Sequence, residues 1–243
     1  MKAKRQRLDQ LLVERGLAES REKAKALILA GQVRVDGQRS GKAGKEISLE
    51  ANVELLAPPP YVSRGGFKIA KALDEFGIDP AGWICLDIGS STGGFTDCLL
   101  QRGASKVYAF DVGTGQMDWK LRNDPRVVLR EGVNARNLTP ADVAERSRLA
   151  VCDVSFISVT LILPALPPLL CEDGELVILV KPQFEVGREQ VGKGGIVREP
   201  ELHQQAIDRI AAAAQSLGYR TAWTDSPILG AEGNKEFLLH ARH

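Results

Sequence analysis

The chain has 243 residues, of which 44% are hydrophobic and 26% charged, and its formal net charge is +1. This composition is typical of a globular protein, and the length allows one large domain or a small domain joined to a mid-sized one. No window approaches the roughly 18 consecutive apolar residues of a transmembrane helix, and the N-terminus leads into no apolar stretch typical of a secretory signal. We therefore expect a cytoplasmic protein with no membrane partner.

The four cysteines are far apart in the sequence, with no C-x-x-C pair: Cys85, Cys98, Cys152 and Cys171. Two of them lie in apolar, strand-like runs, where a reduced thiol behaves as a small hydrophobic group. Their spacing indicates neither a metal site nor a disulfide framework.

The first segment is basic and has a compact helix-helix-strand pattern. Residues 1–60 contain 12 Lys and Arg against 8 Asp and Glu, whereas residues 61–243 contain 20 against 23. Leucines at helical spacing from Leu8 predict a helix ending at Gly16, and Ser20 is a suitable N-cap for a second helix ending at Gly31. A strand from Val33 into an Asp-Gly turn follows, with further short strands near residues 45–47 and 52–56.

Five basic residues cluster at the start of the first predicted helix and early in the second: Arg5, Arg7, Arg21, Lys23 and Lys25. Two helix starts carrying this charge could form one phosphate-binding face, because phosphate neutralisation is a general source of affinity for nucleic acids. A solvated basic face is the alternative interpretation.

A proline run, Ala57-Pro58-Pro59-Pro60-Tyr61, is the clearest linker in the chain. Consecutive prolines lack amide donors, so neither a helix nor a central strand continues through them. We place a small domain at residues 1–57, the linker at 58–62 and a larger domain at 63–243.

The larger domain alternates strands and helices from about residue 84. Predicted strands cover residues 84–88, 106–111, 127–131, 149–154 and 175–181, a helix covers about 201–217, and residues 220–224 and 236–241 could form a closing antiparallel pair. This alternation predicts an α/β fold with a mostly parallel sheet covered on both faces. Ligands of such sheets bind beyond the carboxyl ends of the strands.

A glycine-rich turn follows the first of these strands, in Leu86-Asp87-Ile88-Gly89-Ser90-Ser91-Thr92-Gly93-Gly94-Phe95-Thr96. Its G-x-x-x-G-G spacing differs from the G-x-G-x-x-G of nicotinamide enzymes. Asp87 would repel a pyrophosphate but could pair with the amino group of S-adenosylmethionine, and Asp111, which ends the next strand, could bind ribose hydroxyls. The predicted cofactor-binding residues are Asp87, Gly89, Ser90, Gly93, Gly94, Phe95, Asp111, Asn134 and Asp153. A nicotinamide oxidoreductase, or a turn without a ligand, remains an alternative.

Two further polar residues end strands at the same predicted edge. Asp153 ends the fourth strand and Lys181 the fifth. A lysine at the end of a buried strand is costly unless it is paired or functional, although such a side chain can also extend to solvent.

Four residues, Lys68, Asp153, Lys181 and Glu236, fall where FtsJ-like ribose 2′-O-methyltransferases carry a Lys-Asp-Lys-Glu tetrad. Three motifs, Ser63-Arg64-Gly65-Gly66-Phe67-Lys68, Cys152-Asp153-Val154-Ser155-Phe156-Ile157-Ser158 and Val180-Lys181-Pro182-Gln183-Phe184-Glu185, resemble the TlyA family along nearly the whole chain. The resemblance implies an S4-type α+β RNA-binding domain followed by a Rossmann-like class I methyltransferase domain. In that domain a seven-stranded, mostly parallel sheet has an antiparallel last strand.

The resemblance also implies roles for the tetrad in methylating ribosomal RNA. Lys181 would be the base for a ribose hydroxyl, which requires a neighbouring cation such as Lys68 and partial desolvation to weaken its hold on a proton. Asp153 would orient Lys181, and Glu236 would hold Lys68 or the ribose. Members of the family are often labelled haemolysins, so a membrane-active protein is one alternative and a non-catalytic RNA-binding protein is another.

A long glycine-rich basic loop, residues 187–198, directly follows the Lys181 strand. Loops of this length are often functional, and we interpret this one as an RNA clamp or lid, with disorder as the alternative. Lys193 and Arg198 of this loop, together with Arg64, complete the predicted RNA-binding residues.

Overall fold

The computed structural model describes residues 4–57, 59–230 and 232–243. Residues 1–3 of the predicted RNA-binding domain and Pro58 of the predicted linker lie outside the described residues. The chain divides into two compact units, residues 1–59 and residues 60–243. Each unit has a hydrophobic core of its own.

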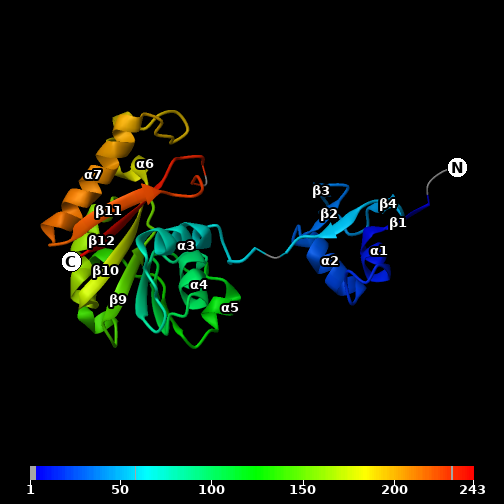
Figure 1. The fold of residues 1–243 in the computed structure, drawn as a ribbon, viewed down its shortest axis with the longest axis horizontal. Coiled ribbons are helices and arrows are strands. Elements are labelled where there is room, and N and C mark those ends of the chain that lie inside the picture. Colours follow the sequence, from blue (N-terminus) through cyan, green and yellow to red (C-terminus); the bar gives the residue numbers. More distant parts are fainter. Residues whose placement is uncertain (1–3, 58, 231) are drawn as a thin grey trace. The chain divides into compact units, whose positions relative to one another are not determined.

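The small unit consists of two helices and five short strands (Figure 1). Leu8, Leu12 and Ile28 are fully buried between the two helices and the strands. The second helix begins as predicted, because the Ser20 side chain accepts a hydrogen bond from the amide of Lys23. The elements are β1 (Arg5–Arg7), α1 (Leu8–Glu14), α2 (Arg21–Leu29), β2 (Val33–Val35), β3 (Gln38–Arg39), β4 (Glu46–Ser48) and β5 (Val53–Leu55).

The predicted Asp-Gly turn is confirmed, and the first helix begins at Leu8, where the leucine spacing starts, but the strand just before it was not predicted. Asp36 and Gly37 both have positive φ, as a two-residue hairpin turn requires. Arg5 and Arg7, which we expected at a helix start, lie in β1, which pairs antiparallel with β4. That pairing joins residues about 40 positions apart, so no local pattern reveals it.

The large unit contains a seven-stranded sheet in the order β11-β12-β10-β9-β6-β7-β8. The strands from β10 to β8 are parallel, and β12 pairs antiparallel with both of its neighbours, which confirms the predicted topology. The strands are β6 (Ile84–Ile88), β7 (Lys106–Phe110), β8 (Val127–Arg130), β9 (Ser147–Cys152), β10 (Leu170–Val180), β11 (Arg220–Asp225) and β12 (Phe237–Arg242).

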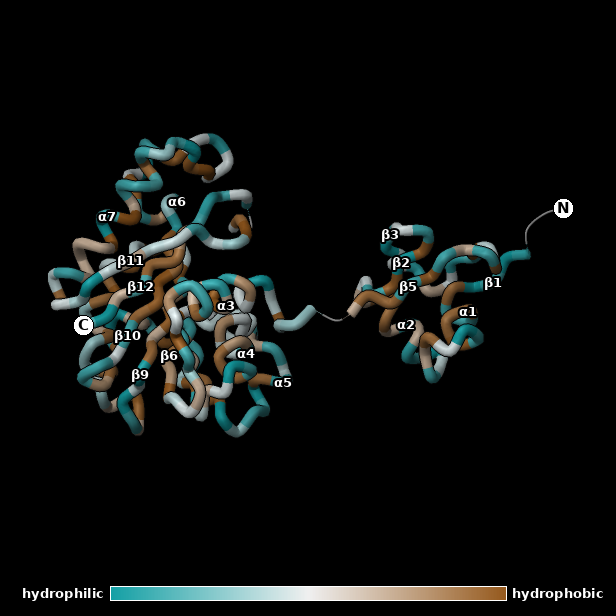
Figure 2. The backbone as a smooth tube through the Cα atoms, viewed as in Figure 1, coloured by the Kyte–Doolittle hydropathy of each residue, from teal (hydrophilic) through white to brown (hydrophobic). Residues whose placement is uncertain are grey.

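Helices cover both faces of the sheet, and the apolar strands run through its interior (Figures 1 and 2). One core packs the sheet against α7, and the other packs it against α3 and α4. The helices are α3 (Gly65–Phe76), α4 (Gly94–Gln101), α5 (Trp119–Arg122), α6 (Pro182–Glu185) and α7 (Pro200–Ser216). Short 3₁₀ turns are η1 (Ala135–Asn137), η2 (Pro140–Asp142), η3 (Val159–Leu161), η4 (Leu163–Ala165), η5 (Pro167–Leu169) and η6 (Arg188–Gln190).

Four of the predicted strands, those ending at residues 111, 131, 154 and 181, extend one or two residues too far at their carboxyl ends. Asp111, Asp153 and Lys181 each lie just beyond a strand rather than within it. Their polar side chains bond to neighbouring loops, so the ladder ends before them. The structure also begins β10 five residues earlier than predicted, with an irregularity in its pairing to β9 between Leu170 and Glu175.

Candidate active site

The carboxyl ends of four parallel strands form the edge of the sheet that holds the site. The ladder brings Ile88 of β6 level with Phe110 of β7 and Cys152 of β9. The amide of Asp153 then donates to the Ile88 carbonyl at 2.9 Å. Residues that follow these strands are therefore held on a rigid, buried support.

Lys181 and Asp153 form the first of two ion pairs at this edge, and both residues are partly buried. Their Nζ and Oδ1 atoms are 2.5 Å apart, and the side chains are 12% and 22% exposed. Lys181 also donates a 2.9 Å hydrogen bond to the hydroxyl of Ser155. The amine is thus fixed by two groups from the segment that follows β9.

Lys68 and Glu236 form the second pair, with 2.5 Å between Nζ and Oε2 and side-chain exposures of 10% and 3%. Lys68 lies on the buried face of α3, and Glu236 directly precedes β12. Each lysine of the predicted tetrad therefore has a carboxylate of its own.

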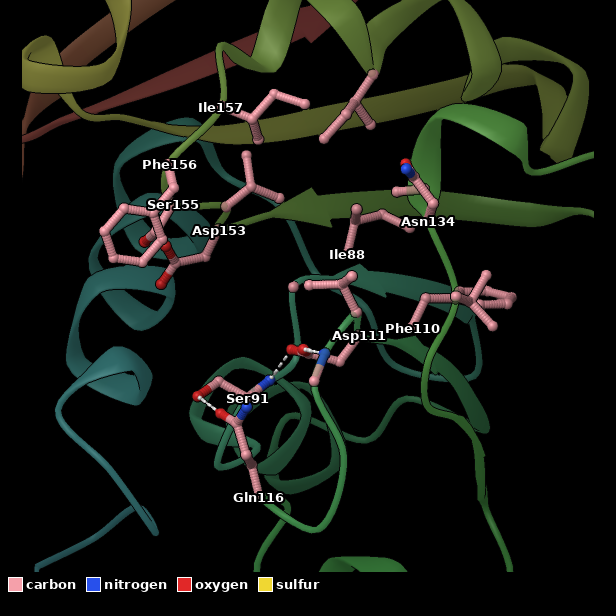
Figure 3. A pocket seen from close by; sticks show the side chains of 17 residues that line it. Ile88, Ser91, Phe110, Asp111, Gln116, Asn134, Asp153, Ser155, Phe156 and Ile157 are labelled. Atoms are coloured by element: carbon pink, nitrogen blue, oxygen red, sulfur yellow. Dashed lines mark hydrogen bonds between the residues drawn. The ribbon is translucent and has the colours of Figure 1, made fainter.

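A cavity of about 480 Å³ lies beside the first pair, at the carboxyl ends of β6, β7 and β9 (Figure 3). This volume is within the usual range for small-molecule sites. Four of the predicted cofactor-binding residues line it: Gly89, Asp111, Asn134 and Asp153. Asn134 also accepts a hydrogen bond from the amide of Arg136, so it both lines the cavity and stabilises a turn.

Asp111 organises the wall of this cavity. Its two carboxylate oxygens accept hydrogen bonds from the amides of Ser91 and Gly113, each at 2.7 Å, and the Ser91 hydroxyl bonds to Gln116 (Figure 3). At Gly89, φ is +83°, and a Cβ would collide with the carbonyl oxygen of Asp153. Only glycine allows the turn to approach the end of β9 this closely.

Asp87 lies elsewhere than expected. Strand side chains alternate between faces, so Asp87 points away from Leu86 and Ile88, toward α4. There its Oδ2 accepts hydrogen bonds from the amide and hydroxyl of Thr96, at 3.0 and 2.6 Å. Complete burial, partly opposed by these bonds, raises the pKa of Asp87 to about 7.

Five predicted cofactor-binding residues are absent from the cavity wall: Asp87, Ser90, Gly93, Gly94 and Phe95. Phe95 belongs to the core, and a Cβ on Gly94 would collide with the Ser63 hydroxyl, so this part of the turn packs against α3. Among the described residues, the buried Ser90 hydroxyl and Asp87 Oδ1 have no hydrogen-bond partner.

A second cavity, of about 270 Å³, adjoins the first along Ser155 and Phe156, which line both. Lys181 and Glu236 also line it, together with Gln183, Phe184, Val191, Gly195 and Glu232. Phe156 is 92% exposed, has a positive φ of 66° and packs against Phe184 with ring centroids 5.3 Å apart. An exposed phenylalanine in this conformation is unusual and is typical of a functional position.

Sequence analysis assigned no role to Phe156, Phe184 or Gln183. Neither an outward-pointing ring nor a left-handed backbone at a residue other than glycine has a local sequence signal. The available clue was that both phenylalanines belong to motifs containing tetrad residues.

The basic residues of the small unit divide into those with carboxylate partners and those without. Arg7 and Arg21 both contact the buried carboxylate of Asp9, at 2.9 and 3.3 Å. The hydrogen bond from Arg7, joined by that from Arg21 and opposed by burial, lowers the pKa of Asp9 to about 2. Three further residues of the small unit were predicted to bind RNA. Arg5 bonds to the Glu46 carbonyl, Lys23 pairs with Glu19, and Lys25 is exposed.

The basic loop is ordered by a buried amide in the large unit. Asn234, 1% exposed, donates to the Gly195 carbonyl and accepts from the amide of Val197. Lys193 and Arg198 on this loop are exposed, as is Arg64 just before α3. The loop therefore lies against the segment that carries Glu236.

Comparison with known proteins agrees with this geometry. A sequence model of FtsJ-like methyltransferases matches residues 61–243, and one of the S4 domain matches residues 6–53. The chain belongs to the FtsJ-like methyltransferase family. The resemblance to TlyA proteins is also confirmed, because full-length relatives carry that name.

Three relatives of this FtsJ-like methyltransferase are similar over nearly the whole chain. The Bacillus subtilis protein "Putative rRNA methyltransferase YqxC" is 51% identical over 99% of this chain and 86% of its own. The Mycobacterium tuberculosis "16S/23S rRNA (cytidine-2'-O)-methyltransferase TlyA" is 48% identical over 99% and 91%. The solved structure "Putative hemolysin from Streptococcus thermophilus" has a TM-score of 0.76 and 46% identity, covering 98% of this chain and 88% of that one.

Relatives of the FtsJ-like methyltransferase thus carry two kinds of name, one enzymatic and one membrane-damaging. In the part of the chain that the structure covers, no helix combines the length and apolar character needed to cross a bilayer.

Proposed function

We propose that this protein is an S-adenosylmethionine-dependent methyltransferase that modifies a ribose 2′-hydroxyl of ribosomal RNA. The observation that carries the proposal is the convergence of Lys68, Asp153, Lys181 and Glu236, from four parts of the chain, into one buried and one partly buried ion pair beside adjoining cavities. Buried charges are costly and are typical of functional sites. Relatives named for rRNA 2′-O-methylation support the substrate.

The larger cavity fits an adenosine-containing cofactor. Asp111 would hold the ribose hydroxyls, Asn134 would face the adenine, and Gly89 lets the turn that lines the cavity approach the end of β9. The unpartnered oxygens of Ser90 and Asp87 lie behind this turn and offer polar contacts to a ligand or to bridging water. When bound, S-adenosylmethionine supplies a methyl group that its sulfonium charge activates for displacement.

The chain's own residues would position the ribose hydroxyl and take up its proton. Lys181 is the group placed to accept that proton or to stabilise the developing negative charge on oxygen. Asp153 and Ser155 hold the amine in place, and Lys68, fixed by Glu236, adds positive charge at the ribose. Alignment of the reacting atoms could supply about 7–11 kcal/mol of barrier reduction, so positioning is the larger share of the expected effect.

The smaller cavity suits the nucleotide to be methylated. Phe156 exposes one ring face beside Lys181, and a stacked base commonly gains about 1–3 kcal/mol on such an aromatic platform. A nucleotide in this position must leave its helix, as it does for other enzymes that modify nucleotides within folded nucleic acid.

The small unit, proposed as an RNA-binding domain over residues 1–57, contains no Phe, Tyr or Trp. It therefore has no aromatic side chain on which to stack a base, and its basic residues would contact phosphates. Residues 58–62 would link it to the catalytic domain at residues 63–243. Arg64, Lys193 and Arg198 would add phosphate contacts around the site, and the proposed location is the cytoplasm, where ribosomal RNA is found.

The test is to incubate the protein with S-adenosylmethionine and unmodified ribosomal subunits, digest the RNA, and identify methylated nucleosides by mass spectrometry. A nucleoside methylated on its ribose oxygen is expected. Base methylation would contradict the assigned reaction, and the absence of any methylation despite cofactor binding would contradict the substrate. Release of dye from liposomes, without any methylation, would favour the membrane-active alternative.

A further inference from the structure

Glu185 is a buried carboxylate to which the proposed mechanism gives no task. It ends α6, four residues after Lys181, and is 4% exposed. Its Oε2 accepts a 2.6 Å hydrogen bond from the hydroxyl of Ser158, and its Oε1 accepts a 2.8 Å bond from the amide of Val159. Among the residues that the structure covers, no Lys or Arg forms an ion pair with this carboxylate.

Glu185 binds the Ser158 hydroxyl and the Val159 amide, which lie at the carboxyl end of a short segment between the two cavities. This partition segment, residues 153–158, begins where Asp153 bonds to Ile88 and ends at Ser158. Val154, Ser155, Phe156 and Ile157, between these anchors, line the larger cavity, and two of them also line the smaller one. The segment contains a residue with positive φ, so its backbone is strained and needs support at both ends.

The helix that carries Glu185 begins next to Lys181 and is itself fixed. Pro182, which follows Lys181, is the first residue of α6. Arg209 on α7 donates a 2.6 Å hydrogen bond to the carbonyl of Glu185, and Phe184 packs against Phe156. Glu185 therefore joins the helix that starts at Lys181 to the far end of the segment that holds Asp153 and Ser155.

We propose that Glu185 is a positioning residue for methyl transfer: through Ser158 and Val159 it sets the distance between the partition segment and Lys181. The proposal rests on the function proposed above. Glu185 forms no salt bridge among the described residues, and burial raises its pKa, opposed by the bonds from Ser158 and Val159 and then by the charge of Arg209. An apolar residue would therefore serve the fold alone more cheaply. Its two short bonds to an amide and a hydroxyl are of the stronger, charge-assisted kind.

The experiment compares Glu185→Ala, Glu185→Gln and Ser158→Ala with the wild type in the full-length protein. The single-turnover rate on ribosomal subunits, the cofactor Kd and the melting temperature are measured for each. Glu185→Ala is expected to slow the reaction about 10- to 100-fold, because small displacements of catalytic groups have effects of this size. Its cofactor Kd should change less than about threefold, since Asp111, Asn134 and Gly89 keep their own supports.

Glu185→Gln tests whether the shape and hydrogen bonds of this side chain matter for the reaction, or its negative charge. Glutamine has nearly the same shape, keeps one carbonyl oxygen for the Val159 amide and can donate to Ser158, so Glu185→Gln should keep the rate within about threefold of wild type. Ser158→Ala removes one of the two bonds and should lie between these limits. Ile210→Ala, a truncation on α7 in the same core, is the control for lost stability and should lower the melting temperature without slowing the reaction at a temperature where it is folded.

A second readout needs no RNA. In protein labelled with ¹³C-lysine and ¹⁵N, the Lys181 side-chain signal and the amide signals of residues 153–159 should shift in Glu185→Ala and stay near their wild-type positions in Glu185→Gln. Unchanged signals, or an equal loss of rate in Ile210→Ala, would overturn the positioning role. Shifted signals in a protein that never methylates ribosomal RNA would instead reject the proposed function and leave the positioning role intact.

Discussion

Asp9 in the small unit and Asp87 in the large unit are both fully buried, yet their pKa values are displaced in opposite directions. The guanidinium groups of Arg7 and Arg21 contact Asp9, whose pKa falls to about 2, while the two arginine side chains remain 43% and 48% exposed. Among the residues that the structure describes, Thr96 alone forms hydrogen bonds with the Asp87 side chain, and burial raises the pKa of Asp87 to about 7.

The difference shows two uses of a buried carboxylate. In the small unit it anchors two cations whose outer faces remain available to a polyanion, so a single group supports both the fold and the proposed RNA surface. In the large unit Asp97 pairs with the exposed Lys120 in a similar way, but Asp87 and Glu185 form no ion pair among the described residues, and Asp153 and Glu236 pair with lysines that are themselves largely buried. Such arrangements cost stability and are typical of sites that bind or react.

The largest stability effect is expected at the most deeply buried pair of the large unit. Glu236→Gln leaves the Lys68 ammonium buried without its carboxylate, and breaking such a pair typically costs about 3–5 kcal/mol. All three tryptophans lie in the large unit, so tryptophan fluorescence during denaturation reports this unit alone.

Two controls accompany this measurement. Glu75→Gln, in the exposed pair with Lys71 on α3, should cost less than about 1 kcal/mol. The double variant Lys68→Met/Glu236→Gln should recover part of the loss, because no charge is then stranded. Equal losses of stability in Glu236→Gln and Glu75→Gln would show that burial does not increase the contribution of the Lys68–Glu236 pair to stability.

Asp87→Asn should remove the pH dependence that this carboxyl gives to the free energy of unfolding, rather than lower stability at every pH. A carboxyl whose pKa is raised from 3.8 to about 7 makes the folded protein less stable as pH rises from about 4 to about 7, with no further change above. The variant should therefore gain stability over wild type across this range, by on the order of 4 kcal/mol at most. Denaturation at pH 4.5, 6 and 8 checks this, and a constant difference between the two proteins would contradict it.

Asp9→Asn should have the opposite pH signature in the small unit. Stability from a carboxyl with a pKa lowered to about 2 is fully present above about pH 4 and is lost as pH falls toward 2. At neutral pH the variant should lose about 1–2 kcal/mol, after allowance for its partly exposed arginine partners.

The small unit has no aromatic residue, so hydrogen exchange of the α2 amides in the full chain is the suitable measurement for Asp9→Asn. The same variant should bind RNA at least as tightly as wild type at low temperature, because Arg7 and Arg21 lose a competing anion. Weaker binding by the folded variant would indicate that the arginines act only within the fold.

The smallest effect is expected for Lys25→Ala. This lysine is exposed, so stability should change by less than about 0.5 kcal/mol. If it contacts a phosphate, the slope of log affinity for RNA against log salt should fall by about 0.7–0.9. Lys106→Ala, at the opposite end of the parallel strands from the site, is the control and should leave the slope unchanged.

Most of the fold was readable from the sequence, because apolar runs bounded by glycine and polar residues mark buried strands. The strand from Ile84 to Ile88 was predicted residue for residue, and the antiparallel closing pair was also confirmed. Strand β1 was missed because its partner is distant in sequence. Strand ends were misplaced where a polar side chain, such as that of Asp111, bonds to a loop amide.

The sequence predicts which residues belong to the candidate site better than it predicts how their side chains are arranged. Asp111, Asp153 and Lys181 could be named because polar residues after parallel strands share one edge of the sheet, whereas Lys68 and Glu236 could be named only from the resemblance to the FtsJ-like tetrad. The face to which Asp87 points follows from strand alternation, yet the motif favoured the cofactor interpretation. The exposed ring of Phe156 and the bonds of Glu185 depend on tertiary contacts, which no spacing encodes.

The most direct test of the central claim is single-turnover transfer of a tritiated methyl group from S-adenosylmethionine to ribosomal subunits, comparing wild type with Lys181→Met. Methionine keeps the apolar length of the side chain without the amine, so the cofactor Kd should be unchanged. The account predicts label in ribosomal RNA with wild type and a rate about 10²- to 10⁴-fold lower in the variant. Equal rates would show that Lys181 does not act on the reacting hydroxyl and would contradict the assignment of this site as the centre of methyl transfer.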